Sequence, residues 1–483
     1  MANDAMLKFV DRQQAYPAKR PADARAQDFR EIADRYSPPE GETQAGRCSQ
    51  CGVPYCAVHC PLHNHIPDWL RLTAEGRLRE AYELSNATST MPEICGRICP
   101  QDRLCEGNCV IEFSGHGAVT IGSVEKFITD TAWDEGWVEP VRVGPARGQS
   151  VGIIGAGPAG LSAADYLRTL GYEVHVYDRH DRAGGLLTYG IPGFKLEKHV
   201  IGRRVERLRD GGVVFHENFE VGRDATLEEL RARHDAVLIA TGVYKPRAIA
   251  APGVGSEGVV EALDYLTASN RKGFGDAVPA FDDGSLDAAG KRVVVIGGGD
   301  TAMDCVRTAI RQGATSVKCL YRRDRANMPG SQREVGHAEE EGVEFVWLSA
   351  PQGFDAGDRV TAVRAHRMRL GQPDASGRRA PEIEPGNDFV EPADLVVKAL
   401  GFDAEDLPTL FDAPELGVTR WGTLRVDRDM MTNLDGVFAA GDIVRGASLV
   451  VWAIRDGRDV SEKMHMWLKA KAAAAPKNEK VAA

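Results

Sequence analysis

The clearest hydrophobic pattern in the chain has the order strand, turn, helix, strand. Val151–Ile154 is a short apolar run typical of a buried strand, and residues 161–170 carry apolar side chains at helical spacing. A second apolar run, Glu173–Tyr177, ends at Asp178. Between the first strand and the helix, residues 155–160 have the spacing G-x-G-x-x-G. This order predicts a βαβ unit of the kind that binds a dinucleotide.

The residue types in this turn suit a pyrophosphate. Gly155 permits a tight turn, Gly157 lets the backbone approach the phosphates, and Gly160 lets helix and strand pack closely. The start of the helix offers unpaired N–H groups and the positive end of the helix dipole. Asp178 can accept a hydrogen bond from a ribose hydroxyl. We therefore predict a bound dinucleotide here and not an empty glycine turn.

The same hydrophobic pattern returns in the second half of the chain. Arg292–Ile296 and Ser316–Tyr321 are predicted strands on either side of a helical segment, residues 303–312. The turn at residues 297–302 has the form G-x-G-x-x-A. We interpret the repeat as an internal duplication that supplies a second dinucleotide site.

The two units differ in charge where the second strand ends. In the first unit Asp178 would repel a phosphate on the ribose, whereas Arg322 and Arg323 stand at the equivalent place in the second. An arginine pair suits a 2′-phosphate, so the second site is predicted to prefer NADPH to NADH. The alternative is that both arginines lie in a solvated loop end.

Weaker patterns complete the expected elements. Apolar runs predict further strands at residues 213–219, 235–241, 395–400 and 436–442. Helical periodicity marks residues 24–36, 66–85, 122–136, 199–209 and 447–460. Residues 1–47 are expected to form a leading arm with little chemistry, residues 270–290 a linker, and the last fifteen residues a frayed tail.

Composition narrows the class of protein. A chain of 483 residues allows two to four domains, and a net charge of −11 with mixed signs argues against a nucleic-acid partner. No apolar run approaches the 18 or more residues of a membrane span, and no apolar signal segment is visible. We expect a cytoplasmic, soluble protein with no nucleic-acid and no membrane partner.

Eight of the ten cysteines lie between residues 48 and 109. In a reducing compartment such clustering indicates metal binding rather than disulfides. Zinc ribbons use two Cys-x2-Cys knuckles and only one is present, so structural zinc is the weaker alternative and two 4Fe–4S clusters the stronger. Both cysteine groups are candidate ligands: Cys48, Cys51, Cys56 and Cys60, then Cys95, Cys99, Cys105 and Cys109.

Ferredoxin spacing gives a first ligand assignment. A cysteine that precedes proline, as Cys60 precedes Pro61, ligates the other cluster in ferredoxins. Cys60 would then cross from the first cluster to the second. Counting sulfurs alone makes all eight cysteines ligands, Cys95 among them.

The remaining cysteines, Cys305 and Cys319, stand alone. No pair of the Cys-x2-Cys or Cys-x4-Cys type occurs in residues 150–483, and we expect the two single residues to be small and buried. Residues 150–483 therefore offer no redox-active cysteine pair of these two spacings.

Several motifs in order resemble a known family. The cysteine groups, GAGPAG, AGGLLTYGIPGFKL, ATG, GGGDTAMDC, YRR and AAGD resemble the small (beta) subunits of NADPH-dependent glutamate synthase over essentially the whole chain. The same module resembles the N-terminal half of dihydropyrimidine dehydrogenase. The glycine turns alone are unspecific, and the cysteine groups and LTYGIPGFKL carry most of the likeness.

The resemblance implies an α/β fold with two Rossmann-like dinucleotide-binding domains, for FAD and NADPH, preceded by a mainly helical iron–sulfur domain. The helical domain with two 4Fe–4S clusters would span residues 1–146. The FAD-binding domain would span residues 147–280 and 408–483, interrupted by an inserted NADPH-binding domain at residues 281–407.

The glycine patterns and the resemblance together nominate the cofactor-binding residues. Asp442 has an alternative interpretation as a helix N-cap. For FAD the candidates are Gly155, Gly157, Pro158, Ala159, Gly160, Asp178, Arg179, Gly185, Leu186, Thr241, Gly242, Gly441 and Asp442. For NADPH they are Gly297, Gly299, Asp300, Thr301, Ala302, Arg322 and Arg323.

The resemblance to dihydropyrimidine dehydrogenase also implies a different ligand set for the clusters. That relative uses an amide from a following helix as one ligand, and this chain has a carboxylate, Glu125, at the matching place. The alternative is that Glu125 is an exposed helix residue. By position, one cluster would be held by Cys48, Cys51, Cys56 and Cys109, and the other by Cys60, Cys99, Cys105 and Glu125, with Cys95 left out.

The activity implied is that of an NADPH-dependent flavoprotein oxidoreductase. NADPH would give hydride to FAD, and single electrons would pass through two clusters to a large FMN-containing partner subunit. There glutamine-derived ammonia and 2-oxoglutarate would become glutamate. No residue is nominated as a general acid or base, because the cofactors carry the chemistry. The alternatives are electron input to another acceptor, of the pyrimidine or ferredoxin type, and a structural interaction module.

Overall fold

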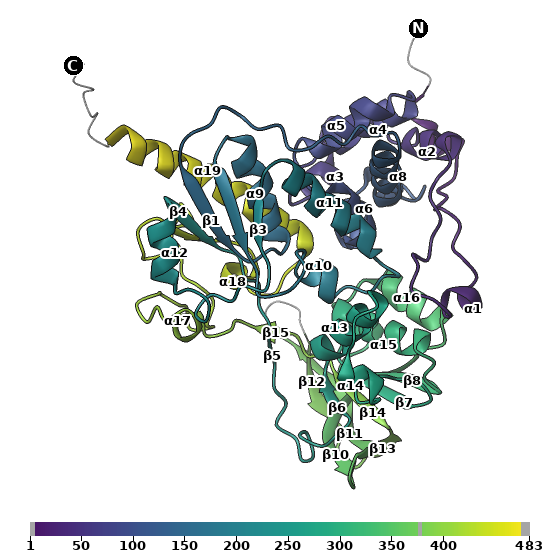
Figure 1. Ribbon diagram of the computed structural model, residues 1–483. Coiled ribbons are helices and arrows are strands. Elements are labelled where there is room, and N and C mark those ends of the chain that lie inside the picture. The colour runs from purple at the N-terminus through teal and green to yellow at the C-terminus, as the bar shows by residue number, and fades with distance from the viewer. Residues whose placement is uncertain (1–4, 375–378, 475–483) are drawn as a thin grey trace, which may run out of the picture.

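The computed structural model describes residues 5–374 and 379–474, and it has three parts (Figure 1). Helices from the first third of the chain, in purple and blue, lie beside two separate parallel sheets, and the long C-terminal helix crosses the first sheet. This arrangement confirms the predicted fold class. No helix among the described residues is long and apolar enough to cross a membrane.

The helical part is built from short amphipathic helices around a small core. Trp69, Leu70, Phe127 and Ile128 are buried in this core, close to the cysteines. The single helix expected over residues 66–85 is two helices, because Gly76 adopts a φ of +73° between them. The helices are α2 (Pro38–Ala45), α3 (Tyr55–Val58), α4 (Ile66–Ala74), α5 (Leu78–Asn86), α6 (Pro92–Ile98), α7 (Val110–Phe113) and α8 (Ile121–Asp134), with η1 (Lys8–Val10) and η2 (Gln101–Arg103).

The first sheet is parallel and has the order β16-β4-β1-β2-β3. Helices α9 and α19 pack against each other on one side of it, and α12 contacts β1 and β4. The strands are β1 (Ser150–Ile154), β2 (Glu173–Tyr177), β3 (Val214–His216), β4 (Ala236–Ile239) and β16 (Val437–Ala439). The helices are α9 (Pro158–Thr169), α10 (Leu186–Tyr189), α11 (Lys198–Asp210), α12 (Leu227–Arg233), α17 (Leu407–Leu410), α18 (Asp442–Arg445) and α19 (Val450–Ala474).

The second sheet is also parallel, in the order β6-β14-β7-β8-β9. Helix α15 contacts α13 and α16, and an antiparallel sheet shares a second core with the strands. The parallel strands are β6 (Val259–Glu261), β7 (Arg292–Ile296), β8 (Ser316–Tyr321), β9 (Glu344–Trp347) and β14 (Leu395–Lys398); the antiparallel strands are β10 (Ser349–Ala356), β11 (Val360–Pro373), β12 (Arg379–Ile383) and β13 (Phe389–Pro392). The helices are α13 (Ala262–Gly273), α14 (Pro279–Asp282), α15 (Asp300–Arg311), η3 (Arg325–Asn327) and α16 (Gln332–Glu340).

The chain passes between the two sheets through a two-stranded link. Strands β5 (Lys245–Pro246) and β15 (Phe402–Asp403) pair antiparallel, just after Thr241 and Gly242. The second sheet begins before residue 281, the boundary expected from sequence, because β6 pairs with β14 and α13 packs on α15. The expected linker at residues 270–290 likewise contains the end of α13 and the whole of α14.

Two terminal segments differ from their expectations. Helix α19 continues to Ala474, so the first six residues of the expected frayed tail are helical, and residues 475–483 lie outside the described residues. Of the helix expected over residues 24–36, only residues 24 and 25 are helical, at the end of α1 (Ala22–Arg25). The chain beyond it turns back, and the Ile32 carbonyl accepts a hydrogen bond from the Arg20 N–H at 2.9 Å.

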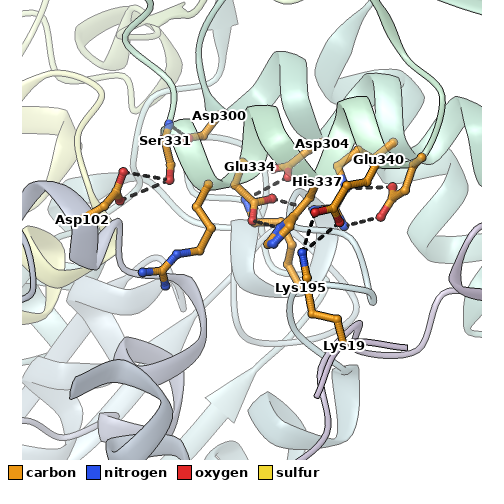
Figure 2. A network of polar contacts seen from close by, with 12 residues as sticks. Lys19, Asp102, Lys195, Asp300, Asp304, Ser331, Glu334, His337 and Glu340 are labelled. Carbon is orange, nitrogen blue, oxygen red and sulfur yellow. Dashed lines mark hydrogen bonds and ion pairs between the residues drawn. The ribbon is translucent and has the colours of Figure 1, made fainter. Parts of the chain in front are cut away.

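The leading arm connects two parts of the molecule and therefore has a structural role. Arg25, only 1 % exposed, donates to Glu341 at 2.9 Å, and Lys19 pairs with Glu340 at 2.6 Å at the end of α16 (Figure 2). Lys195, in the loop after α10, pairs with Asp304 of α15 at 2.9 Å. The arm and the first nucleotide-binding domain are thereby both fixed to the second domain.

Removing the Glu341 carboxylate is expected to destabilise the whole assembly. Its side chain is fully buried and pairs with Arg25, Arg307 and Arg311 at 2.6–2.9 Å. Burial opposes ionisation, but the two helix arginines outweigh it and lower the pKa of Glu341 to about 2. Glu341→Ala would leave buried guanidinium groups without a counter-charge, a loss of about 3–5 kcal/mol that thermal unfolding would detect.

The matched control is Glu339→Ala, on the exposed side of the same helix. Glu339 pairs with Arg325 at 2.8 Å, and both side chains are more than a third exposed. An exposed pair contributes about 0–1 kcal/mol, so this variant should unfold close to the native temperature. Equal effects of the two variants would contradict the importance of the buried cluster.

Candidate functional site

The first glycine turn has the geometry that a pyrophosphate needs. Gly155 has a φ of +107°, and a Cβ there would lie 2.4 Å from the Ala240 carbonyl oxygen. A Cβ at Gly160 would lie 1.9 Å from the Gly155 oxygen, so only glycine allows helix α9 to pack this closely on β1. At Gly157 a Cβ would meet nothing within 4 Å. The backbone of the turn therefore faces open space at the start of α9.

Asp178 lies beside this turn at the end of β2. Its Oδ2 accepts from the Ala156 N–H at 2.7 Å and its Oδ1 from the His180 N–H at 2.8 Å. The carboxylate lines a cavity of about 280 Å³ together with Gly155, Arg179 and Thr241, at the carboxyl ends of β1 and β4. A cavity of this size at the end of a glycine turn fits the adenosine part of a dinucleotide.

Tyr244 and Glu405 line this cavity but lie far from the glycine turn in sequence, and sequence reasoning missed them. Arg179 pairs with Glu405 at 3.0 Å, and its guanidinium lies 4.8 Å from the ring centre of Tyr244. Tyr244 and Glu405 both belong to the link between the domains. Neither stands in a motif, so no sequence signal identified them.

Two more segments converge on the first turn. The Gly184 N–H donates to the Ala156 carbonyl at 2.9 Å, and a Cβ at Gly185 would lie 2.8 Å from the Gly157 Cα. From the other side, a Cβ at Gly441 would lie 2.9 Å from the Ala159 Cβ. The structure therefore gathers the candidate FAD residues of three distant segments around one turn.

Asp442 is the first residue of α18, and the N-cap is Gly441. The alternative interpretation of Asp442 as a helix N-cap is therefore wrong. Burial raises the pKa of Asp442 to about 7. A half-buried carboxyl of this kind, next to the first glycine turn, suits a hydrogen bond to the hydroxyls of a bound dinucleotide.

The second glycine turn repeats the geometry of the first. Gly297 has a φ of +149°, and a Cβ there would lie 2.2 Å from the Ala399 carbonyl oxygen. A Cβ at Gly299 would meet nothing within 4 Å, which leaves the turn open in front of α15. Ala302 is fully buried in the third slot, where glycine stands in the first unit. Thr301 follows Asp300 in the first turn of the helix.

Arg322 and Arg323 follow β8 beside this second turn. Across residues 5–374 and 379–474, neither guanidinium has a carboxylate partner, and the Arg323 Nε is buried without a hydrogen bond. A buried guanidinium nitrogen with no partner favours an absent anion. Arg323 therefore fits a 2′-phosphate site, whereas Arg322 is exposed, as a solvated loop end would also be.

The eight clustered cysteines line two separate cavities. Glu125 projects from α8 into the second cavity. The first is lined by Cys48, Cys51, Cys56 and Cys109, and the second by Cys60, Cys95, Cys99 and Cys105. The first group has the four cysteines implied by the resemblance, and the second has the three implied cysteines and Glu125 but also Cys95, which the resemblance left out. Cys60 and Cys109 are exchanged between the two stretches of sequence, as the resemblance implied.

Both cavities suit iron–sulfur clusters in their donor chemistry. Burial raises the pKa of Cys48 to about 11 and that of Cys56 to about 12, so these thiols stay neutral unless a metal stabilises the thiolate. Groups of three or more His, Cys, Asp or Glu close enough to hold a single metal ion do not occur among the described residues. Thiolates of a 4Fe–4S cluster bind separate irons and need not converge on one point.

The fourth ligand of the second cavity has two candidates in the structure. Glu125 is 7 % exposed and accepts from Ser85 Oγ at 3.1 Å, so its interpretation as an exposed helix residue is wrong. Cys95 lines the same cavity one helical turn before Cys99, and its thiol lies 3.8 Å from Ser89 Oγ.

The two isolated cysteines have no part in the site. Cys305 on α15 and Cys319 on β8 are fully buried and belong to the core of the second domain. Their prediction as small core residues is confirmed.

Comparisons with known proteins agree with this arrangement. Residues 25–137 match the family described as dihydropyrimidine dehydrogenase domain II, 4Fe-4S cluster, and residues 149–457 match the pyridine nucleotide-disulphide oxidoreductases. The chain is 69 % identical to the glutamate synthase [NADPH] small chain of Azospirillum brasilense, over 98 % of each protein. It is 45 % identical to the small chain of Escherichia coli K12, over 96 % of this chain and 99 % of that protein.

The chain belongs to the glutamate synthase small-chain family. The family likeness confirms the resemblance drawn from the motifs. A longer protein of Escherichia coli K12, the putative oxidoreductase AegA, is 44 % identical over 96 % of this chain and 72 % of its own length. The glutamate synthase small-chain module therefore also occurs as part of a larger oxidoreductase.

Solved structures support the fold of the small chain. Mycobacterium tuberculosis FprA in complex with NADPH superposes with a TM-score of 0.58 at 22 % identity, covering 68 % of this chain and 86 % of that one. Lactococcus lactis thioredoxin reductase gives a TM-score of 0.50 at 22 % identity, covering 67 % of this chain and 99 % of that one. Both likenesses cover about two thirds of this chain.

Proposed function

We propose that this chain is the NADPH-oxidising, electron-input small chain of a glutamate synthase. The observation that carries the proposal is a single hydrophobic core that the second cysteine cavity shares with the first parallel sheet. Cys95 and Cys99, which line the second cysteine cavity, pack together with Ile98 in the same hydrophobic core as the first parallel sheet. Val451 of α19 lines that cavity directly. A cluster held there would lie against the domain that holds FAD.

The chain's residues have distinct tasks in this proposal. Gly297 and Gly299 with Arg322 and Arg323 hold NADPH, and the turn at residues 155–160 holds FAD. FAD supplies the conversion between hydride transfer and single-electron transfer. The second cavity, with Cys60, Cys99, Cys105 and either Glu125 or Cys95, holds the cluster nearer to FAD, and the first cavity, with Cys48, Cys51, Cys56 and Cys109, holds the outer cluster.

Exposed apolar side chains lie close in sequence to the cysteines of the first cavity. Five large ones flank these cysteines along the chain, Tyr55 and Val110 among them line the cavity itself, and Phe113 is 74 % exposed. Exposed apolar patches of this kind mark protein interfaces. We assign the patch to the large glutamate synthase chain, which would receive electrons here. Its members are Val53, Tyr55, Val58, Val110 and Phe113.

The isolated chain is expected to oxidise NADPH with an artificial acceptor and to make no glutamate. The chain has candidate sites for the cofactors of electron input, and the FMN at which glutamate forms is assigned to the large chain. The measurement compares NADPH oxidation with glutamate formation from glutamine and 2-oxoglutarate, with and without the large chain. Glutamate formation by the small chain alone would contradict the division of labour.

Cofactor content tests the proposal most directly. Metal, sulfide and flavin analysis of the purified chain should give about eight irons per FAD, as two 4Fe–4S clusters require. Reduction by dithionite or NADPH should produce a low-temperature EPR signal. A zinc-containing or EPR-silent protein would favour the structural interaction module.

The second candidate function is electron input to a different acceptor. The observation that favours it is the likeness to AegA, in which a related module covers 72 % of a longer oxidoreductase. Purification of the chain from its native cell with its bound partner separates the two candidates. The large glutamate synthase chain is the partner expected here.

A further inference from the structure

A loop of the helical domain touches the second glycine turn through one serine. The loop at residues 101–106 joins Cys99 to Cys105, two candidate ligands of the second cavity. The Asp102 carboxylate accepts from Ser331 Oγ at 3.2 and 3.3 Å (Figure 2). Arg103 Nη1 donates to the Pro329 carbonyl at 2.5 Å.

Ser331 and its neighbour also contact the turn itself. The Ser331 N–H donates to Asp300 Oδ1 at 3.0 Å, and Figure 2 shows Ser331 between Asp102 and Asp300. The Gly330 N–H donates to the Gly298 carbonyl at 3.0 Å. Residues 330–331 therefore form one wall of the turn, and their position depends on the loop of the helical domain.

The hydroxyl of Ser331 is used in an unusual way. Ser331 is the N-cap of α16, where a serine side chain ordinarily accepts from a backbone N–H of the first turn. Here the side chain makes no capping hydrogen bond and donates to Asp102, although it is only 6 % exposed. Ser331 therefore links two domains and leaves the N-terminus of its own helix without a side-chain cap.

A second contact fixes the other end of the same loop. Arg333 Nη2 donates to Glu106 Oε2 at 2.7 Å, and Glu106 Oε1 accepts from the Gly122 N–H at 3.0 Å. Glu106 is buried and follows Cys105 directly, while Gly122 belongs to the first turn of α8, which carries Glu125. The loop is thus held between the second cysteine cavity and the start of α16.

We propose that Asp102 and Ser331 are positioning residues for the nicotinamide nucleotide, and that the loop at residues 101–106 couples the second cluster to nucleotide binding. Asp102 holds Ser331, and Ser331 holds Asp300 in the first turn of α15. The inference rests on the proposed function, because it needs NADPH at the second turn and a cluster in the second cavity. Coupling between two sites is reciprocal, so nucleotide binding must alter the cluster as the cluster alters nucleotide binding.

The test measures NADP⁺ affinity by isothermal titration calorimetry on the holoenzyme. Ser331→Ala and Asp102→Ala should each raise the Kd for NADP⁺ about 5- to 10-fold, with iron and FAD content unchanged, and the double variant should add nothing further. Ser331→Thr keeps the hydroxyl and should bind nearly as the native chain does. Asp282→Ala is the control and should bind NADP⁺ with native affinity, because Asp282 is an exposed ion-pair partner of Lys272.

Redox titration followed by EPR supplies a readout that a merely structural role would not move. In the native chain, NADP⁺ should shift the midpoint potential of one cluster, by about 60 mV for a tenfold coupling, and Ser331→Ala should abolish the shift. Ser331 lies outside the cysteine segments, so Ser331→Ala tests the coupling even if Asp102→Ala loses iron.

The outcomes separate this inference from the proposed function. Native affinity in Ser331→Ala and Asp102→Ala, additive losses in the double variant, or an unchanged potential shift would each overturn the coupling while leaving the proposed function intact. A native holoenzyme that fails to bind NADP⁺ at all would overturn the proposed function and the coupling with it.

Discussion

Replacing Arg322 and Arg323 together by glutamine is expected to raise the KM for NADPH by about 10-fold or more and to leave the KM for NADH nearly unchanged. Both guanidinium groups lie beside the second glycine turn without a carboxylate partner in the described part of the chain. Charge-assisted hydrogen bonds to a 2′-phosphate contribute about 1.5–3 kcal/mol, and NADH lacks that phosphate.

Arg325→Gln is the matched control for this prediction. Arg325 lies in the same segment but pairs with Glu339 at 2.8 Å, so its charge is already compensated. Steady-state kinetics with an artificial acceptor would give both KM values for each variant. Unchanged discrimination in the double variant, or an equal loss in Arg325→Gln, would remove the two arginines from the nucleotide site.

The two nucleotide-binding units could be predicted almost residue by residue. Strands β2, β7 and β8 have the bounds expected from their apolar runs. Each depends on local rules: a buried strand is a short apolar run, and a G-x-G turn needs a positive φ that other residues rarely adopt. Gly155 and Gly297 both have that conformation.

Elements that depend on distant partners could not be predicted in this way. Strand β6 has three residues, and its pairing with β14 is what makes it a strand. The helical periodicity of the leading arm at residues 24–36 predicts a helix that does not form, and Arg25 acquires its role through Glu340 and Glu341, more than three hundred positions away. Sequence patterns report local periodicity, whereas both features are set by tertiary contacts.

The residues of the candidate site also separate into those that local motifs identify and those that only tertiary contacts reveal. The glycine turns, Asp178 and the arginine pair stand in motifs and were identified from them. The grouping of the cysteines came from the resemblance, because ferredoxin spacing alone gives no partner for Cys109. Asp102 and Ser331 could not be identified at all, since a lone aspartate and a lone serine acquire meaning only where two domains meet.

Counting sulfurs and the family resemblance predict different fourth ligands for the second cluster, Cys95 and Glu125 respectively. Cys95 and Glu125 line the same cavity, so proximity does not choose between them. The resemblance favours an oxygen ligand from α8, and Glu125 reaches the cavity from that helix. Cys95 lies on α6, one helical turn before Cys99 at the C-cap of that helix.

We expect Cys95→Ser to keep the full iron content and Glu125→Ala to lose about four irons per chain or to change the EPR signal of one cluster. Glu125→Gln should keep its cluster, because the amide oxygen can take the place of the carboxylate, but at an altered potential, since ligand charge is one determinant of that potential. Cys319→Ser, in the core of the second domain, is the control for removing a buried thiol. Iron and sulfide analysis per FAD gives the count. If Cys95→Ser loses about four irons and Glu125→Ala loses none, the ligands are the eight cysteines and the assignment of Glu125 is wrong.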